Sequence, residues 1–216
     1  MNRSHKNCLV LSFFLMAHLA GSPRALPENK DPGSRLTVRV FNYAQASPQT
    51  WNLARKIATY ILGRTGIQTF WLECSLSSEG NFTIPACEQP LGSSDLVLRL
   101  VPASPATRAQ FGSGTLGIAA QPERGTPASA SVFYDRVEQL AKGGTTSLPV
   151  ILGHAAAHEI GHLLLGSDSH SPLGLMRAQM RAQWSRQDLQ NAVVGDLLFT
   201  AEQARVMRAA ALRRLR

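Results

Sequence analysis

Two histidines and a glutamate in the segment HEIGH form the clearest chemical pattern in the sequence. His158 and His162 are four residues apart, so on a helix they lie on one face, a turn from each other. Two imidazoles placed in this way can both reach one Zn²⁺ ion at about 2.1 Å. Glu159 lies next to the metal but off the line of the ligands, where it can take a proton from a metal-activated water. The spacing predicts a zinc site in which Glu159 is the general base.

The residues around HEIGH add to this pattern. Gly161 lies inside the motif, and a glycine in mid-helix costs about 1 kcal/mol relative to alanine. We therefore expect another segment of the chain to approach the helix closely at that point. Gly166 is the expected end of the helix, and the segment SDSHSPLGLM after it carries His170 at a distance from which the chain can turn back beneath the metal.

With these residues the chain resembles the metzincin clan of zinc peptidases. The clan's pattern is HExxHxxGxxH, followed by a tight turn that holds a methionine beneath the metal. The corresponding stretch here is HEIGHLLLGSDSHS followed by PLGLM, in which the glycine falls one residue late and the last histidine two residues late. HEIGHLLLG…SHS..G(I/L)M is also similar to the pattern of a group of predicted secreted bacterial proteins. The resemblance implies His170 as the third zinc ligand and Met176 as the methionine of the Met-turn.

Asp168 is the alternative third ligand. It stands where an unexpanded motif would place that ligand, and some metzincins use aspartate there. We favour His170 because neutral imidazole suits zinc well and because Gly166 is displaced too.

His154 lies one turn before His158 and on the same face of the expected helix. A zinc pair made of His154 and His158 would have Ala155 in the place where a base is needed. We therefore predict a core or supporting role for His154.

The elements that must position these residues follow from hydrophobic periodicity and turn signals. The expected strands cover residues 36–43, 67–73, 95–101, 115–120 and 131–137, and the expected helices cover residues 48–63, 148–166, 185–194 and 200–215. Thr200 and Gln203 form a capping box at the start of the last helix. This order predicts an α/β domain with a mixed, mostly parallel sheet of about five strands, an active-site helix and a C-terminal helix.

The resemblance also covers the strand that would bind a substrate. TLGIAA, a Pro/Gly loop and SVFYDRV match the edge strand and the next strand above the cleft in this clan. An extended peptide is expected to pair with the edge strand by β-addition. The residues expected to form this substrate strand are Leu116, Gly117, Ile118 and Ala119.

The N-terminal residues and the cysteines predict export. Residues 1–25 have the charged start and apolar run of a signal peptide, and the run is too short for a stable membrane anchor. Residues 26–35 are expected to be a flexible mature N-terminus, and residues 36–216 a single metzincin-like zinc peptidase domain. Cys74 and Cys87 remain as an even pair that predicts a disulfide. We expect a secreted or periplasmic protein.

The charge of the chain indicates no nucleic-acid partner. Removing residues 1–25 removes Arg3, Lys6 and Arg24 and no acid, so the formal net charge falls from +8 to +5. The arginines near the C-terminus are not interleaved with aromatic residues and are expected to form a solvated helix face. We expect a monomer whose partner is a peptide or protein substrate.

Together these patterns predict a secreted endopeptidase with one Zn²⁺ per chain, which hydrolyses peptide bonds with a metal-activated water and a glutamate base. One alternative is a catalytically inactive zinc-containing binding protein of the same fold, but structural zinc needs no base such as Glu159. A gluzincin-type enzyme would take its third ligand from a later helix, where Glu202 is the candidate. A chance motif on a core helix is the remaining alternative.

Overall fold

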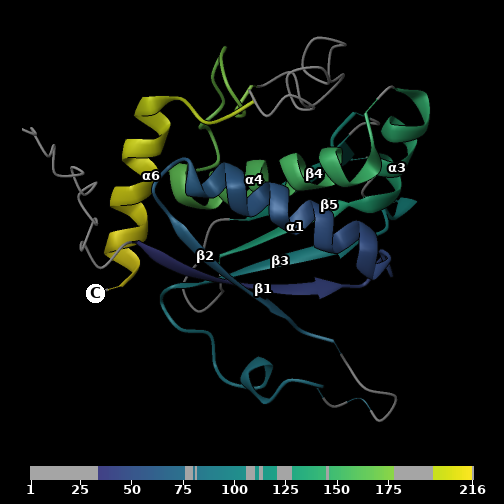
Figure 1. Cartoon of the computed structure of the whole chain (residues 1–216), viewed down its shortest axis with the longest axis horizontal. Helices are drawn as coiled ribbons and strands as arrows, with labels where there is room; N and C mark the ends of the chain where they lie inside the picture. The colour runs from purple at the N-terminus through teal and green to yellow at the C-terminus, as the bar shows by residue number, and fades with distance from the viewer. Residues whose placement is uncertain are drawn as a thin grey trace, which may run out of the picture. The chain divides into compact units, whose positions relative to one another are not determined.

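The computed structural model describes residues 34–75, 80, 82–105, 110–111, 114–120, 128–144, 146–177 and 197–215. The expected signal peptide, nearly all of the expected N-terminal segment 26–35 and the expected helix 185–194 lie outside these residues. The described elements are, in chain order, β1 (Arg35–Asn42), α1 (Pro48–Gly63), β2 (Gln68–Glu73), η1 (Pro85–Cys87), β3 (Asp95–Val101), β4 (Gly117–Ala120), β5 (Ser129–Phe133), α3 (Tyr134–Gly143), α4 (Leu148–Leu165) and α6 (Ala201–Arg214) (Figure 1).

The five described strands form one sheet in the order β2-β1-β3-β5-β4. β1 pairs in parallel with β2 and β3, and β3 pairs in parallel with β5. β4 is antiparallel to β5 and lies at the edge of the sheet. The predicted fold class, an α/β arrangement with a mixed and mostly parallel sheet of five strands, is confirmed.

The expected strand 131–137 is wrong in its second half. β5 ends at Phe133, and Tyr134 begins helix α3. Tyr134, Val137, Leu140 and Ala141 recur at helical spacing and pack against the core. A window that stops at Val137 contains too few of these positions to distinguish the helical period from strand alternation.

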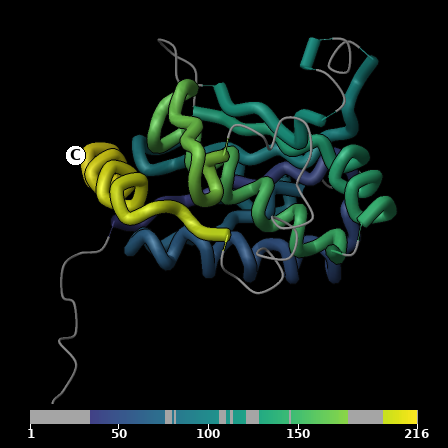
Figure 2. Tube along the Cα trace, turned by 90° about the horizontal axis from the view of Figure 1, so that it is seen from above, coloured from purple at the N-terminus to yellow at the C-terminus, as the bar shows by residue number. Residues whose placement is uncertain are grey.

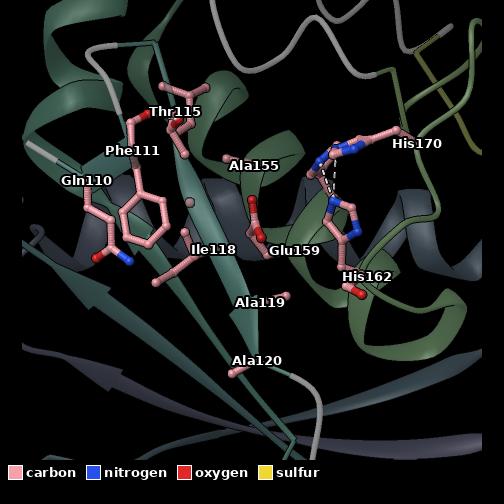
Figure 3. Close-up of a pocket in the computed structure, with 14 residues that line it drawn as sticks. Gln110, Phe111, Thr115, Ile118, Ala119, Ala120, Ala155, Glu159, His162 and His170 are labelled. Atoms are coloured by element: carbon pink, nitrogen blue, oxygen red, sulfur yellow. Dashed lines mark hydrogen bonds between the residues drawn. The ribbon is translucent and has the colours of Figure 1, made fainter. Parts of the chain in front are cut away.

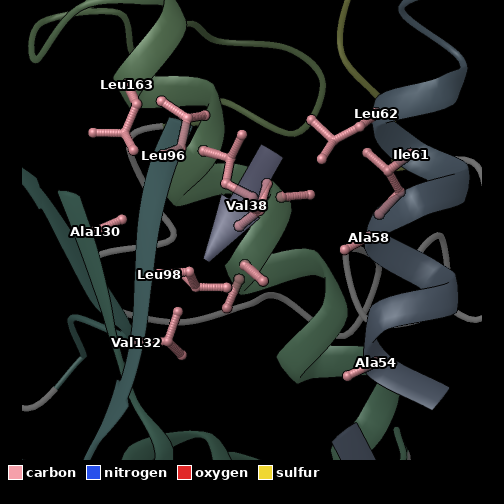
Figure 4. Close-up of a cluster of buried hydrophobic side chains, with 14 of the residues drawn as sticks. Val38, Ala54, Ala58, Ile61, Leu62, Leu96, Leu98, Ala130, Val132 and Leu163 are labelled. Atoms are coloured by element: carbon pink, nitrogen blue, oxygen red, sulfur yellow. The ribbon is translucent and has the colours of Figure 1, made fainter. Parts of the chain in front are cut away.

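A hydrophobic core lies between one face of the sheet and the helices α1 and α4 (Figure 4). Leu96 and Leu98 of β3 and Val132 of β5 are fully buried there. From α1, Ala58 is fully buried and Ile61 is 1% exposed. Helix α4 contacts α1, α3, α6 and the strands β3, β4 and β5. Almost every side chain of α4 from Ile151 to Leu164 is therefore buried.

Helix α4 is also long and apolar enough, by length and composition, to cross a membrane. However, 78% of its most apolar window is buried inside the protein, and the helix carries His158, Glu159 and His162. Burial inside the protein and the presence of these polar side chains are both properties of the core helix of a globular domain.

The opposite face of the sheet carries the disulfide. Cys74 and Cys87 are bonded, which confirms the predicted pair. Arg39 of β1 alternates with core residues and so points to this second face, where it donates to Asp95 Oδ2 at 2.6 Å and to the carbonyls of Gln89 and Pro90 at 2.6 and 3.0 Å. The disulfide and Arg39 together fasten the loop after β2 to the sheet.

Helix α6 is tied to the turn that follows α4 (Figure 2). Its predicted capping box is confirmed, because Thr200 and Gln203 cap each other reciprocally. Gln203 Nε2 also donates to Ser171 Oγ at 2.8 Å, and the Leu175 amide donates to the carbonyl of Leu198 at 2.8 Å. The C-terminal helix thereby holds in place the segment that returns beneath the histidines.

Candidate metal centre

Three histidines meet where α4 and the segment after it face the cleft (Figure 3). The Nε2 atoms of His158 and His162 are 3.1 Å apart, and those of His162 and His170 are also 3.1 Å apart. All three ligand atoms lie within 4.8 Å of one another, an arrangement that could hold a metal ion. Asp168 is exposed and does not belong to this group within the described part of the chain.

The hydrogen bonds of the ring Nδ1 atoms establish which nitrogen faces the site. His158 Nδ1 is 2.9 Å from the carbonyl oxygen of Leu175. A carbonyl only accepts, so this Nδ1 must carry the proton and Nε2 the lone pair. His162 Nδ1 lies 3.1 Å from Ser169 Oγ and 3.3 Å from the carbonyl oxygen of Gly166. His162 therefore also donates from Nδ1 and directs the Nε2 lone pair at its neighbours.

Burial keeps His158 neutral. Desolvation lowers the pKa of His158 to about 3; His162 lowers it further, the hydrogen bond to Leu175 raises it, and His170 adds the smallest lowering. His158 is 3% exposed. A neutral imidazole with a free Nε2 lone pair is the form that binds a metal.

The chain returns to α4 through a sharp turn at the end of the helix. Gly166 has φ of 108°, a conformation that favours glycine, and its amide donates to the carbonyl of His162 at 2.9 Å. Ser169 Oγ donates to the Gly166 carbonyl at 2.6 Å. This turn places His170 opposite His162.

Met176 is fully buried and packs against Gly161 of α4. A Cβ added to Gly161 would lie 2.8 Å from Met176 Sδ and 2.7 Å from Cε1 of Phe199. The expected close approach at Gly161 is thus confirmed, and two segments make it rather than one. The turn itself is closed by the Ser171 amide, which donates to the carbonyl of Met176 at 2.7 Å.

Glu159 lies between the histidines and the edge strand β4 (Figure 3). It is 5% exposed and forms part of the wall of a cleft of about 620 Å³. The cleft is lined by Gln110, Phe111, Thr115, Leu116, Gly117, Ile118, Ala119, Ala120, Ala155, His158, Glu159, His162, Ser167 and His170. Among the described residues of this lining, Glu159 is the one carboxylate.

The four residues expected to form the substrate strand all line the cleft. Gly117, Ile118 and Ala119 belong to β4, and Leu116 immediately precedes it. The Phe133 amide donates to the Leu116 carbonyl at 2.8 Å, and buried Arg136 donates to the Thr115 carbonyl at 2.7 Å. Among the described strands β4 pairs only with β5, so its second edge is turned toward the cleft.

His154 stays apart from the three clustered histidines. Its Nδ1 is 2.8 Å from the carbonyl of Val150, one turn earlier on α4, and burial lowers its pKa. The expected core role therefore agrees with its position.

Sequence reasoning missed three contributors to the site. Ser169 contacts His162, Phe199 covers Gly161, and Phe111 lines the far end of the cleft. The glycine inside HEIGH indicated that something approaches the helix, but no local pattern identified which residues do so.

Neither a protein-family model nor a curated protein matches the chain. Among solved structures it is similar to archaemetzincin from Methanopyrus kandleri, with 16% sequence identity and a TM-score of 0.48. The alignment covers 84% of this chain and 98% of that chain.

Proposed function

We propose that the protein is a zinc-dependent peptidase of metzincin type, with one Zn²⁺ held by His158, His162 and His170. One observation carries the proposal. The Nδ1 atoms of His158 and His162 both act as donors, so in the neutral rings the two Nε2 lone pairs face each other at 3.1 Å with no proton between them. A bound cation would accept both lone pairs and so satisfy these two buried acceptors.

The donor set suits zinc in particular. Three imidazoles are a known set for catalytic zinc, which keeps a fourth position open. Zn–N bonds of about 2.0–2.1 Å in a tetrahedral site place the nitrogens about 3.3 Å apart, close to the 3.1 Å found here. Bound zinc would polarise a substrate carbonyl and lower the pKa of water toward neutrality.

Glu159 would then act as the base and the acid of peptide hydrolysis. Its carboxylate stands in the cleft beside the histidines, where it can take the proton of the attacking water and return it to the leaving amine. A structural zinc site would need no such residue. This supports an active peptidase over an inactive zinc-containing binding protein of the same fold.

The edge of β4 would bind the substrate backbone, because an extended peptide can add to an exposed strand. Apart from Glu159 and the histidines, the described lining of the cleft is uncharged. We therefore expect peptides with neutral side chains around the scissile bond to be the better substrates.

Export is part of the proposal. The Cys74–Cys87 disulfide favours an oxidising compartment, and residues 1–25 have the charged start and apolar run expected of a signal peptide. A secreted or periplasmic peptidase agrees with both.

The test compares zinc content and peptide hydrolysis in the parent protein, Glu159→Gln and Glu202→Gln. The first variant should keep about one zinc per chain and lose nearly all turnover, because it loses the base and keeps the ligands. Glu202 is an exposed residue of α6 paired with Arg205, so its variant should keep both zinc and activity. Zinc binding without turnover in all three would favour the inactive binding protein, and loss of zinc in Glu202→Gln would favour a gluzincin-type site.

A further inference from the structure

We propose that the hydroxyl of Ser169 is a positioning group for His162, which fixes the protonation and orientation of this imidazole for metal binding. The inference rests on the proposed function, because it concerns the same zinc site. It assigns a role to a residue that is not itself a ligand.

The geometry defines one chain of hydrogen bonds. Ser169 Oγ donates its only proton to the carbonyl of Gly166 at 2.6 Å, which leaves its lone pairs free to accept. His162 Nδ1 lies 3.1 Å from the same oxygen. The ring must therefore donate to Ser169, and the lone pair of His162 stays on Nε2, in the metal site.

Of the two described oxygens near His162 Nδ1, the serine hydroxyl is the better acceptor. The Gly166 carbonyl is 3.3 Å from Nδ1, beyond the usual 2.7–3.2 Å of an N–H···O bond. Ser169 Oγ contacts both the ring, at 3.1 Å, and that carbonyl, at 2.6 Å, so it offers Nδ1 the nearer of these two oxygens. His158 needs no such intermediary, because its Nδ1 is 2.9 Å from the carbonyl of Leu175.

This arrangement gives the expanded segment between HEIGH and His170 a physical role. After the turn at Gly166, the segment SDS (residues 167–169) passes beside His162 before the chain reaches His170. Within that segment Ser169 is half-buried beside the ring, while Ser167 and Asp168 are exposed. The segment thus leads the chain to His170 and supplies the hydroxyl that orients His162.

Partners of a metal-bound histidine typically contribute 10–100-fold to metal affinity. Ser169→Ala should weaken zinc binding by about tenfold, at the lower end of that range, because the Gly166 carbonyl remains as a weaker acceptor. Ser169→Thr keeps the hydroxyl and should restore most of the affinity. Ser167→Ala removes a hydroxyl from the same segment and should bind zinc like the parent.

The experiment combines competitive zinc titration with ¹H–¹⁵N spectra of the imidazole N–H groups in the zinc-loaded proteins. Ser169→Ala should shift the Nδ1–H signal of His162 or speed its exchange with water, and should leave the signal of His158 in place. Equal zinc affinity and an unchanged His162 signal in Ser169→Ala would overturn the inference. Equal disturbance of both histidine signals would also overturn it, because it would show general loosening of the turn.

Failure of the proposed function would look different. If the parent protein bound no zinc, the proposed metal site would be wrong. If the parent and Ser169→Ala bound zinc equally tightly, only the proposed role of the serine would be wrong.

Discussion

The side chain of Glu159 rests directly on the backbone of Gly117. A Cβ added to Gly117 would lie 2.7 Å from both Cγ and Oε1 of Glu159, and 2.7 Å from the carbonyl oxygen of Ser131. Carbon atoms do not approach so closely without displacement. The proposed base thus occupies space that opens only because the edge strand lacks a side chain at this position.

Gly117→Ala should therefore reduce peptidase activity without removing the metal. The new methyl group pushes Glu159 or the edge strand away from its place in the cleft, and a misplacement of about 1 Å can cost on the order of 100-fold in rate. We expect kcat to fall about 10–100-fold while zinc affinity changes little, since the histidines are not touched. Steady-state kinetics and zinc titration on the same preparation measure the two effects.

Gly143→Ala is the matched control for this variant. A Cβ at Gly143, the last residue of α3, meets nothing within 4 Å. This variant should keep full activity. An equally active Gly117→Ala enzyme would mean that the packing of Glu159 on β4 does not position the base.

Gly161→Ala should lower the stability of the metal-free protein. Its methyl group would overlap Met176 and Phe199, and overpacking of a buried site costs about 1–3 kcal/mol. Alanine gains about 1 kcal/mol in helix preference, so we expect a net loss of up to about 2 kcal/mol. Urea unfolding in the presence of a chelator measures the change.

The same substitution at Gly63 serves as the comparison. Gly63 ends α1, and a Cβ there meets nothing within 4 Å, so Gly63→Ala should be neutral or slightly stabilising. If both variants were equally stable, the glycine in HEIGH would have no packing role.

The metal-free protein should lose stability as the pH falls below about 6.5. In the folded chain the pKa of His158 is lowered to about 3, and that of His154 is lowered by burial. Between pH 6.5 and 3 the unfolded chain therefore binds more protons, and acid favours unfolding. His158 alone contributes up to about 1.4 kcal/mol per pH unit within that window.

Denaturant unfolding at pH 7, 6 and 5 with chelator present checks this slope. His158→Gln removes one of the two histidines whose pKa burial lowers, and should show a shallower fall than the parent. Equal slopes in the two proteins would show that His158 is not held neutral by burial.

Much of the arrangement could be predicted from the sequence because local patterns determine it. The alternation in β1, the run of apolar residues in α4 and the capping box at Thr200 each specify their own element. The four-residue spacing of His158 and His162 likewise places both rings on one helix face before any tertiary contact is known.

The rest depends on contacts between distant segments. Phe199 reaches Gly161 only because α6 is tied to the turn at Ser171, and Glu159 meets Gly117 only because β4 is the edge strand beside α4. The change from strand to helix at Tyr134 was missed because aromatic and β-branched residues occur on both sides of it. No spacing rule within one segment encodes these relationships.

Competitive zinc titration of His170→Ala and Asp168→Asn tests most directly whether three histidines bind the zinc. His170 Nε2 belongs to the cluster, whereas Asp168 is exposed on the turn before it. Loss of a ligand should lower zinc affinity by several orders of magnitude in His170→Ala, while Asp168→Asn should bind zinc nearly as well as the parent. If Asp168→Asn lost the metal and His170→Ala kept it, the site would consist of two histidines and an aspartate, and the proposed zinc site would be wrong.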